Sequence, residues 1–228
     1  MIKVKIGLVE LERLKPHEKT VESRVIKVLN SLISTKTLIR PLILDEKTLT
    51  VIDGAHRLKA LRKLGLKVVP ALLVDYLEEE EIRVDRWVRV YVTNPDNIGN
   101  ILSLIKTRFE GHVDIVGSDK SVRVLIDQNL GAEAYRILEV LENSMAGRIP
   151  IKYLARDLLK LEPHTIVLVP PILSKNEVVE AALNENPYPP KTTRHVTILK
   201  RVKIGFKLNQ GEARLMRGNF ILGPYQAS

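Results

Sequence analysis

Residues 51–65 of the chain are VIDGAHRLKALRKLG, and the prediction of the fold starts from them. An apolar pair leads into a tight turn at Asp53 and Gly54. Leucines then recur at helical spacing on one face, which predicts an amphipathic helix that ends near Gly65. A turn between strand and helix presents backbone N–H groups and the positive end of the helix dipole. Such a turn suits anions, although an ordinary strand-to-helix turn with surface charges fits the spacing equally well.

The side chains around this turn could act on a phosphate group. Asp53, His56 and Arg57 bring a carboxylate, an imidazole and a guanidinium to one point. Upstream, residues 15–18 are KPHE, and the proline predicts a turn that ends the first strand. Glu18 then lies just before an apolar stripe of helical period. Its ordinary role would be a favourable charge at a helix N-terminus, whereas its functional role would be a general base.

A third stretch, residues 186–196, is NPYPPKTTRHV. Its prolines stiffen the approach to five consecutive side chains that can donate to an anion. Lysine binds phosphate as a point charge and arginine binds it bidentately. The alternative is a basic surface loop. The five donors are Lys191, Thr192, Thr193, Arg194 and His195.

Composition narrows the classes of protein that are possible. The chain has 228 residues, 45% of them apolar, so we expect a sizeable core and no long disordered region. Cysteine is absent, which excludes disulfides and thiolate chemistry. A net charge of +9 favours nucleic acid or small anions such as nucleotides as partners, but aromatic residues are only 4%, which argues against stacking on single strands. No apolar run is long enough for a membrane span, and we expect a cytosolic protein. Scarce glutamine hints at a thermophilic host.

The periodicities predict an α+β protein with two domains. Short strands and two helices fill residues 1–75, and strand and helix patterns alternate in the second half. We place the first domain at residues 1–92 and a second, α/β domain at residues 93–228. Pro70 predicts an edge strand or a bulge, and residues 197–208 resemble a strand. The single tryptophan, Trp87, fits a core anchor.

Together, the KPHE motif and the sequence IDGAHR at residues 52–57 resemble the ParB/sulfiredoxin superfamily. Within it, PKTTRHV at residues 190–196 resembles the free serine kinases of archaea. That resemblance spans about residues 8 to 196. It implies an enzyme that phosphorylates L-serine with a nucleotide and Mg²⁺, giving O-phosphoserine for cysteine synthesis. It also implies an active-site cleft between the two domains.

Roles for individual residues follow from the resemblance. Glu18 would be the base for the serine hydroxyl, and Asp53 would hold Mg²⁺ directly or through water. The turn formed by Gly54, Ala55, His56 and Arg57 would bind the nucleotide phosphates, and residues 191–195 would close that site from the second domain. Trp87 and His17 are weaker candidates for the serine pocket. The residues do not decide between ATP and ADP as donor; ATP is favoured on general grounds.

Two departures from the family pattern separate this chain from its relatives. Ala55 stands where the archaeal serine kinases have a second histidine and where sulfiredoxins have their reactive cysteine, so sulfiredoxin chemistry is excluded. No helix-turn-helix pattern follows the first unit, which argues against a ParB-type DNA-binding protein or nuclease. That remains the main alternative, beside a non-catalytic nucleotide sensor and a kinase for another small hydroxyl compound. The sequence does not indicate an oligomeric state.

Overall fold

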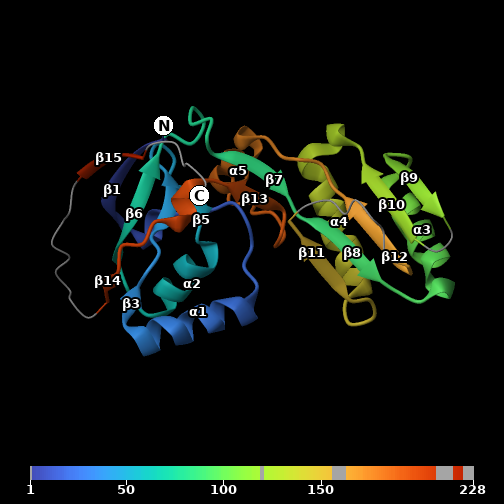
Figure 1. Ribbon diagram of the computed structural model, residues 1–228, viewed down its shortest axis with the longest axis horizontal. Coiled ribbons are helices and arrows are strands. Elements are labelled where there is room, and N and C mark those ends of the chain that lie inside the picture. The colour runs from blue at the N-terminus through green and yellow to red at the C-terminus, as the bar shows by residue number, and fades with distance from the viewer. Residues whose placement is uncertain (1, 119–120, 156–162, 209–217, 223–228) are drawn as a thin grey trace, which may run out of the picture. The chain divides into compact units, whose positions relative to one another are not determined.

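The computed structural model describes residues 2–118, 121–155, 163–208 and 218–222. Contacts divide the chain into two units, and each unit is built from separated segments of sequence (Figure 1). Unit 1 comprises Met1–Arg83, Lys175–Pro190 and His195–Ser228, and unit 2 comprises Val84–Ser174 and Lys191–Arg194. The sequence analysis placed one boundary after residue 92. The chain instead leaves unit 1 before that point and returns to it twice, which no single boundary can represent.

Unit 1 contains a six-stranded mixed sheet in the order β15-β1-β6-β4-β5-β2. Its strands are β1 (Ile2–Glu10), β2 (Lys15–Pro16), β4 (Leu42–Asp45), β5 (Thr50–Asp53), β6 (Val68–Val74) and β15 (Gly218–Leu222). The remaining elements are α1 (Glu22–Thr35), α2 (Ala55–Lys63), α5 (Lys175–Leu183), the short pair β3 (Thr37–Leu38) and β14 (Phe206–Lys207), and the 3₁₀ turns η1 (Leu11–Arg13) and η3 (Ile198–Arg201).

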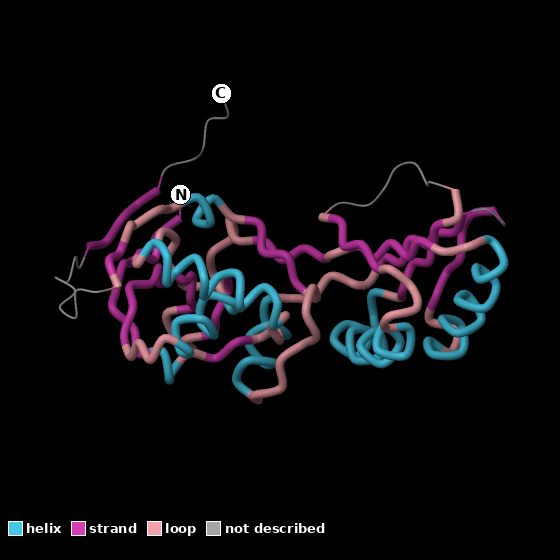
Figure 2. The backbone as a smooth tube through the Cα atoms, turned by 90° about the horizontal axis from the view of Figure 1, so that it is seen from below, coloured by secondary structure: helices cyan, strands magenta, loops and turns pink. Residues whose placement is uncertain are grey.

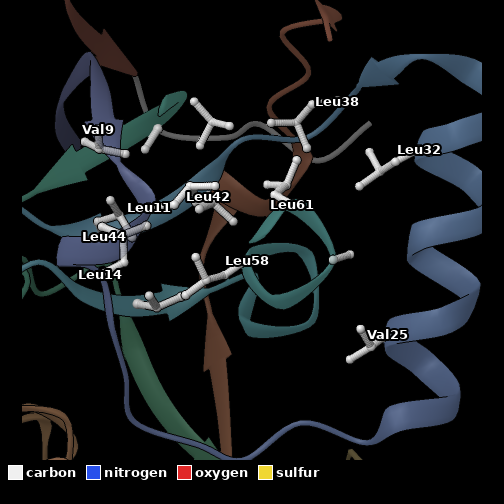
Figure 3. Close-up of a cluster of buried hydrophobic side chains, with 14 residues drawn as sticks. Val9, Leu11, Leu14, Val25, Leu32, Leu38, Leu42, Leu44, Leu58 and Leu61 are labelled. Carbon is white, nitrogen blue, oxygen red and sulfur yellow. The ribbon is translucent and has the colours of Figure 1, made fainter. Parts of the chain in front are cut away.

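The core of unit 1 forms where the apolar stripes of α1 and α2 meet the sheet (Figure 3). Val25 and Leu32 come from α1, Leu58 and Leu61 from α2, and Leu42 from β4, and each is at most 5% exposed. Burying an aliphatic side chain of this size contributes roughly 1.5–3 kcal/mol. This packing fixes where α2 begins, and therefore fixes the turn at Gly54.

Two local predictions for unit 1 were wrong. β6 lies inside the sheet between β1 and β4, so Pro70 is not on an edge strand. The proline is tolerated because the ladder to β4 starts one residue later, where Leu42 is opposite Ala71. The strand predicted at residues 197–208 is instead η3 followed by the short β14. Thr197 caps η3 by accepting a hydrogen bond from the Leu199 backbone N–H, which favours a turn over an extended strand.

Unit 2 is a five-stranded sheet in the order β11-β8-β12-β10-β9, with its two helices on one face (Figure 2). Side chains of β10 alternate between buried and more exposed, as expected for a sheet covered on one side. The elements are β8 (Val88–Val92), α3 (Pro95–Phe109), β9 (Val113–Ser118), β10 (Ser121–Ile126), η2 (Gln128–Leu130), α4 (Gly131–Met145), β11 (Ile151–Leu154) and β12 (Thr165–Val169). A separate two-stranded sheet pairs β7 (Arg83–Arg86) with β13 (Thr193–Val196). The predicted α+β class is confirmed.

No helix among the described residues is long and apolar enough to cross a membrane.

Candidate phosphate-binding site

The turn between β5 and α2 requires glycine at position 54. Gly54 has φ +110°, a conformation that side chains other than glycine rarely adopt. A Cβ atom there would lie 2.6 Å from Leu42 Cδ2 and 2.9 Å from Arg57 Nη2. Leu42 is fully buried and cannot move aside easily. The backbone therefore turns sharply into the N-terminus of α2, where its first N–H groups have no partner within the helix.

Asp53, the last residue of β5, pairs with two cations. One carboxylate oxygen pairs with Arg57 Nη2, and the other lies 3.3 Å from Lys200 Nζ. Arg57 also donates to the Arg40 carbonyl oxygen at 3.3 Å. Burial lowers the pKa of Arg57 and the Asp53 charge opposes that shift, so the guanidinium stays charged. One carboxylate thus holds two positive charges beside the turn.

His56 connects the turn to the start of α1. Its Nε2 accepts a hydrogen bond from the Val21 backbone N–H at 3.1 Å, and Val21 is the residue before α1. Accepting this bond means that Nε2 carries a lone pair, so the neutral ring has its proton on Nδ1. The imidazole therefore helps to fix the position of α2 relative to α1.

A groove of about 910 Å³ opens at the turn, and its described lining is strongly cationic. Val28, Leu32, Leu38 and Ile39 form an apolar part of the wall. Asp53 is the one carboxylate among the described lining residues, against five cationic side chains. The five are Arg24, Lys27, Arg40, Arg57 and Lys203. A groove with this charge and a helix N-terminus at its wall is suited to a phosphorylated ligand that also has an apolar part.

Glu18 lies in a second, smaller hollow that shares Ala55 with the groove. β2 pairs with β5 in parallel, which places the KPHE motif beside the turn. The backbone of Glu18 forms an isolated parallel β-bridge with that of Tyr188, a residue from far along the chain. The hollow has a volume of about 290 Å³ and is also lined by Lys59. The Glu18 carboxylate and the turn at residues 53–57 are therefore both close to Ala55, within unit 1.

Two buried histidines form a cluster with a tyrosine in unit 1. The rings of His17 and His195 lie edge to face, 5.3 Å apart, and His195 Nε2 is 2.7 Å from the Tyr76 hydroxyl. His17 Nδ1 donates to the Val51 carbonyl oxygen at 2.7 Å. Burial lowers the pKa of His17 and lowers that of His195 well below its ordinary value, so both rings are neutral near pH 7. His195 was predicted to contact phosphate, and in this structure its Nε2 contacts a buried phenol.

The other predicted donors of the third motif have partners within unit 2. Lys191 Nζ lies 3.8 Å from the centre of the Trp87 ring, and Trp87 Nε1 donates to the Thr193 carbonyl oxygen. Arg194 pairs with Asp85. Thr192 and Thr193 are 1% and 8% exposed. Trp87 is half-buried, so it is not the core anchor that its residue type suggested.

The structure brings the first two motifs together and adds residues that the sequence analysis missed. Asp53 and Arg57 line the groove and Glu18 lines the smaller hollow, while their roles stay predictions. The groove lining also includes Arg24 and Arg40, and Asp53 pairs with Lys200. These three lie outside the motifs, and only their charge distinguishes them in the sequence. That residues 191–195 contact phosphate stays a prediction.

The carboxylates around the turn offer few ligands to Mg²⁺. Within the described parts of the chain, no group of three or more His, Asp and Glu side chains could hold a metal ion. Both oxygens of Asp53 already face cations. Magnesium keeps several waters and binds phosphate oxygens beside one or two carboxylates. An ion bound through water and nucleotide phosphate would fit this donor set, and Asp53 is the residue that would help to hold it.

Comparisons with known proteins agree with the motifs. Residues 1–86 match the family described as the ParB N-terminal domain. The chain is 26% identical to an ADP-dependent L-serine kinase of Thermococcus kodakarensis, over 91% of this chain and 93% of that protein. It is 29% identical to an ATP-dependent L-serine kinase of Staphylothermus marinus, over 83% of this chain and 84% of that protein. A solved free serine kinase in complex with AMP has the same fold, with a TM-score of 0.64 and 22% identity over 90% of this chain and 93% of that one. Residues 1–86 thus match the ParB N-terminal domain, and most of the chain is similar in sequence to proteins named L-serine kinases.

Proposed function

We propose that the protein transfers a phosphoryl group from a nucleotide to the hydroxyl of free L-serine, giving O-phospho-L-serine. The observation that carries the proposal is the cationic groove at the N-terminus of α2, with the Glu18 carboxylate in the hollow on the other side of Ala55. Phosphoryl transfer needs positioning, neutralisation of charge and a proton acceptor, and unit 1 supplies all three. The named kinase relatives support the same activity.

Each step of the reaction has a group in unit 1. The serine Oγ attacks the terminal phosphorus of the nucleotide and forms the new P–O bond. The bond from that phosphorus to the bridging oxygen breaks, and the shortened nucleotide leaves with the electron pair. Glu18 accepts the proton that Oγ loses. The α2 N–H groups and Arg57 stabilise the charge on the phosphate oxygens. Mg²⁺, when bound, supplies further neutralisation of those oxygens.

The donor and the use of the product belong to this proposal too. One relative is named ADP-dependent and another ATP-dependent, so similarity does not favour either nucleotide. We propose ATP, since it is the commoner phosphoryl donor, and cysteine synthesis as the use of O-phosphoserine. The named relatives come from heat-loving archaea, in keeping with a thermophilic host.

The direct test is to incubate the protein with Mg²⁺, L-serine and either ATP or ADP, and to detect O-phosphoserine by ³¹P NMR. Product from one donor establishes the reaction and identifies that donor. If neither nucleotide gives product although nucleotide binds, the kinase proposal is rejected, and the non-catalytic nucleotide sensor takes its place.

Glu18→Gln tests the assignment of the base. A general base contributes roughly 10²- to 10⁴-fold, so kcat should fall by that factor while the nucleotide Kd stays within a factor of about two. The matched control is Glu12→Gln, which removes an exposed carboxylate on η1 and should leave kcat unchanged. A Glu18→Gln enzyme with near wild-type kcat would remove Glu18 from the mechanism.

Asp53→Asn tests the proposed relation to Mg²⁺. An outer-sphere carboxylate should raise the Mg²⁺ concentration needed for half-maximal activity when it is neutralised. An unchanged Mg²⁺ requirement, measured by titration at saturating nucleotide, would leave Asp53 with one function, that of holding Arg57 and Lys200.

A ParB-type DNA-binding protein is the second candidate, because a cationic groove also suits a nucleic-acid phosphate backbone. Duplex binding whose affinity falls steeply with salt would support it. Serine phosphorylation without such binding would exclude it.

A further inference from the structure

Lys200 is held next to the phosphate-binding turn by a segment that none of the motifs includes. Lys200 lies on η3. The residue before it, Leu199, also belongs to η3, is 1% exposed and anchors η3 in unit 1. The Lys200 ammonium is 3.3 Å from Asp53 Oδ1, and its side chain is 36% exposed. The backbone of η3 is thus fixed, while the end of the side chain reaches solvent beside the turn.

The charges around His17 show where this ammonium lies relative to the proposed base. Burial lowers the pKa of His17, and the charged side chains that act on its ring are Glu18, Asp53 and Lys200. All three charges are thus within electrostatic range of one imidazole, and two of them, Asp53 and Lys200, are in direct contact. Glu18 is the proposed proton acceptor, and Asp53 marks the phosphate-binding turn. Lys200 therefore contacts the turn directly through Asp53, and its charge acts on the same imidazole as that of Glu18.

Stability does not account for two cations on Asp53. Arg57 is the more buried of the two, is fixed by Asp53 and the Arg40 carbonyl, and already neutralises the carboxylate. A second, partly exposed pair at 3.3 Å adds little to folding stability. It does place one uncompensated positive charge at the turn. Lysine has a flexible stem and a compact charge, so its ammonium can move from a carboxylate to a nearby phosphate oxygen.

We propose that Lys200 binds the phosphoryl group that is transferred. In this assignment, which rests on the proposed kinase function, Asp53 holds the ammonium until nucleotide binds. Lys200 then moves to an oxygen of the terminal phosphate. Arg57 stays with Asp53 and serves the phosphates nearer the nucleoside. The two cations on one carboxylate therefore have different tasks, one fixed and one movable.

Binding of AMP, ADP and ATP to the Lys200→Ala variant tests the assignment without any turnover. Loss of one charge-assisted hydrogen bond should weaken binding of the donor nucleotide, ATP or ADP, roughly tenfold or more, with AMP affinity unchanged. Lys200→Arg should restore part of the loss. Lys67→Ala removes an exposed lysine in the connection between α2 and β6 and should change none of the three affinities.

The outcomes separate this inference from the proposed function. An equal loss for AMP, ADP and ATP, or no loss for any, would overturn the role of Lys200 even if serine is phosphorylated. A loss confined to the nucleotide with the transferable phosphate supports it, even if L-serine proves to be the wrong acceptor. Thermal unfolding of each variant confirms that the fold is retained. Kinetics add a second readout, since a contact with the transferred group should lower kcat more than it raises KM for serine.

Discussion

The turn at residues 53–57 and the segment at residues 191–195 contain similar side chains, yet the structure treats them differently. Both combine a guanidinium and an imidazole within five positions. At the turn, Arg57 lines a groove beside a helix N-terminus. In the segment, His195 packs against Tyr76, and Arg194 pairs with Asp85. The donors at the turn line a groove that a ligand can enter. Several side chains of the segment instead contact other residues of the protein.

The difference shows that donor-rich sequence and available donors are separate properties. At the turn, local geometry decides: glycine at position 54 forces the chain into a helix N-terminus, and the N–H groups there have no helical partner. In the segment, burial decides, and burial depends on residues about a hundred positions away, such as Trp87 and Tyr76. The first property is visible in a short motif and the second is not.

Among the variants that test this contrast, Gly54→Ala should have the largest effect on nucleotide binding. The new Cβ would clash with Leu42 and with the Arg57 side chain, and the positive φ would be strained, at a cost of roughly 1–3 kcal/mol. We expect at least a tenfold loss in nucleotide affinity, measured by calorimetry. Gly65→Ala is the matched control, because Gly65 also has positive φ but nothing within 4 Å of the added Cβ.

The two glycine variants together separate strain from shape. If both lose the same stability but only Gly54→Ala loses nucleotide, the close approach at the turn is what binds phosphate. Equal nucleotide affinities for the two variants would mean that the turn is an ordinary strand-to-helix connection, which is the alternative that the spacing left open.

Much of unit 1 could be predicted because its signals are local. Helical periodicity located α1 and α2, and the aspartate-glycine pair located the turn. The division into units could not be predicted, because residues 175–190 and 195–228 return to unit 1 through contacts that leave no periodic signal. η3 was missed for a related reason: the apolar residues that follow it, Val202, Ile204, Phe206 and Leu208, alternate as in a strand, and the Thr197 cap became apparent only in the structure.

The site was predictable to the same extent. Glu18, Asp53 and Arg57 belong to short motifs, and the structure places Asp53 and Arg57 at the turn and Glu18 in the adjoining hollow. Lys200 comes to the turn from η3, about 150 residues further along the chain. A lone lysine in a basic sequence gives no signal of that kind. A local motif therefore predicts only part of the charged site, and tertiary contacts bring the remaining charge.

Lys191→Met tests whether the segment takes part in nucleotide binding. Trp87 is the only tryptophan, so its emission reports on the Lys191 ammonium over its ring. If Lys191 leaves the ring to bind phosphate, nucleotide should change the emission of the wild type but not that of the variant, with a roughly threefold to tenfold loss in affinity. A variant with wild-type affinity would restrict the phosphate donors to unit 1. Lys152→Met, an exposed lysine on β11, is the control.

His195→Gln tests the buried end of the segment through pH. The folded pKa of His195 lies below 6.5 because of burial, with His17, Lys200 and Lys175 adding to the shift. The unfolded chain therefore binds more protons below pH 6.5, so stability is present above that pH and is lost as the pH falls. Each such histidine adds up to about 1.4 kcal/mol per pH unit. Between pH 8 and 5.5, the free energy of unfolding of the variant should fall by less than that of the wild type.

The control for that measurement is His112→Gln, which replaces a half-exposed histidine in unit 2. This variant shows what the loss of an imidazole that is not buried does to the same measurement. If His195→Gln keeps the pH dependence of the wild type, the imidazole of His195 is not held neutral, and its original assignment as a phosphate donor regains support.

Glu22→Gln should have the smallest effect, and it tests how local the turn is. Hydrogen bonds from Lys63 and Lys59 lower the pKa of Glu22 to about 2, and they join α1 to the exposed side of α2. The resulting stabilisation is present above pH 4.5 and is lost as the pH falls towards 2. The variant should therefore have a slightly lower Tm at pH 7, no difference near pH 2, and unchanged nucleotide affinity. A weaker nucleotide affinity would mean that the turn depends on the packing of α1 against α2. The turn would then rely on tertiary contacts, as residues 191–195 do, only to a smaller extent.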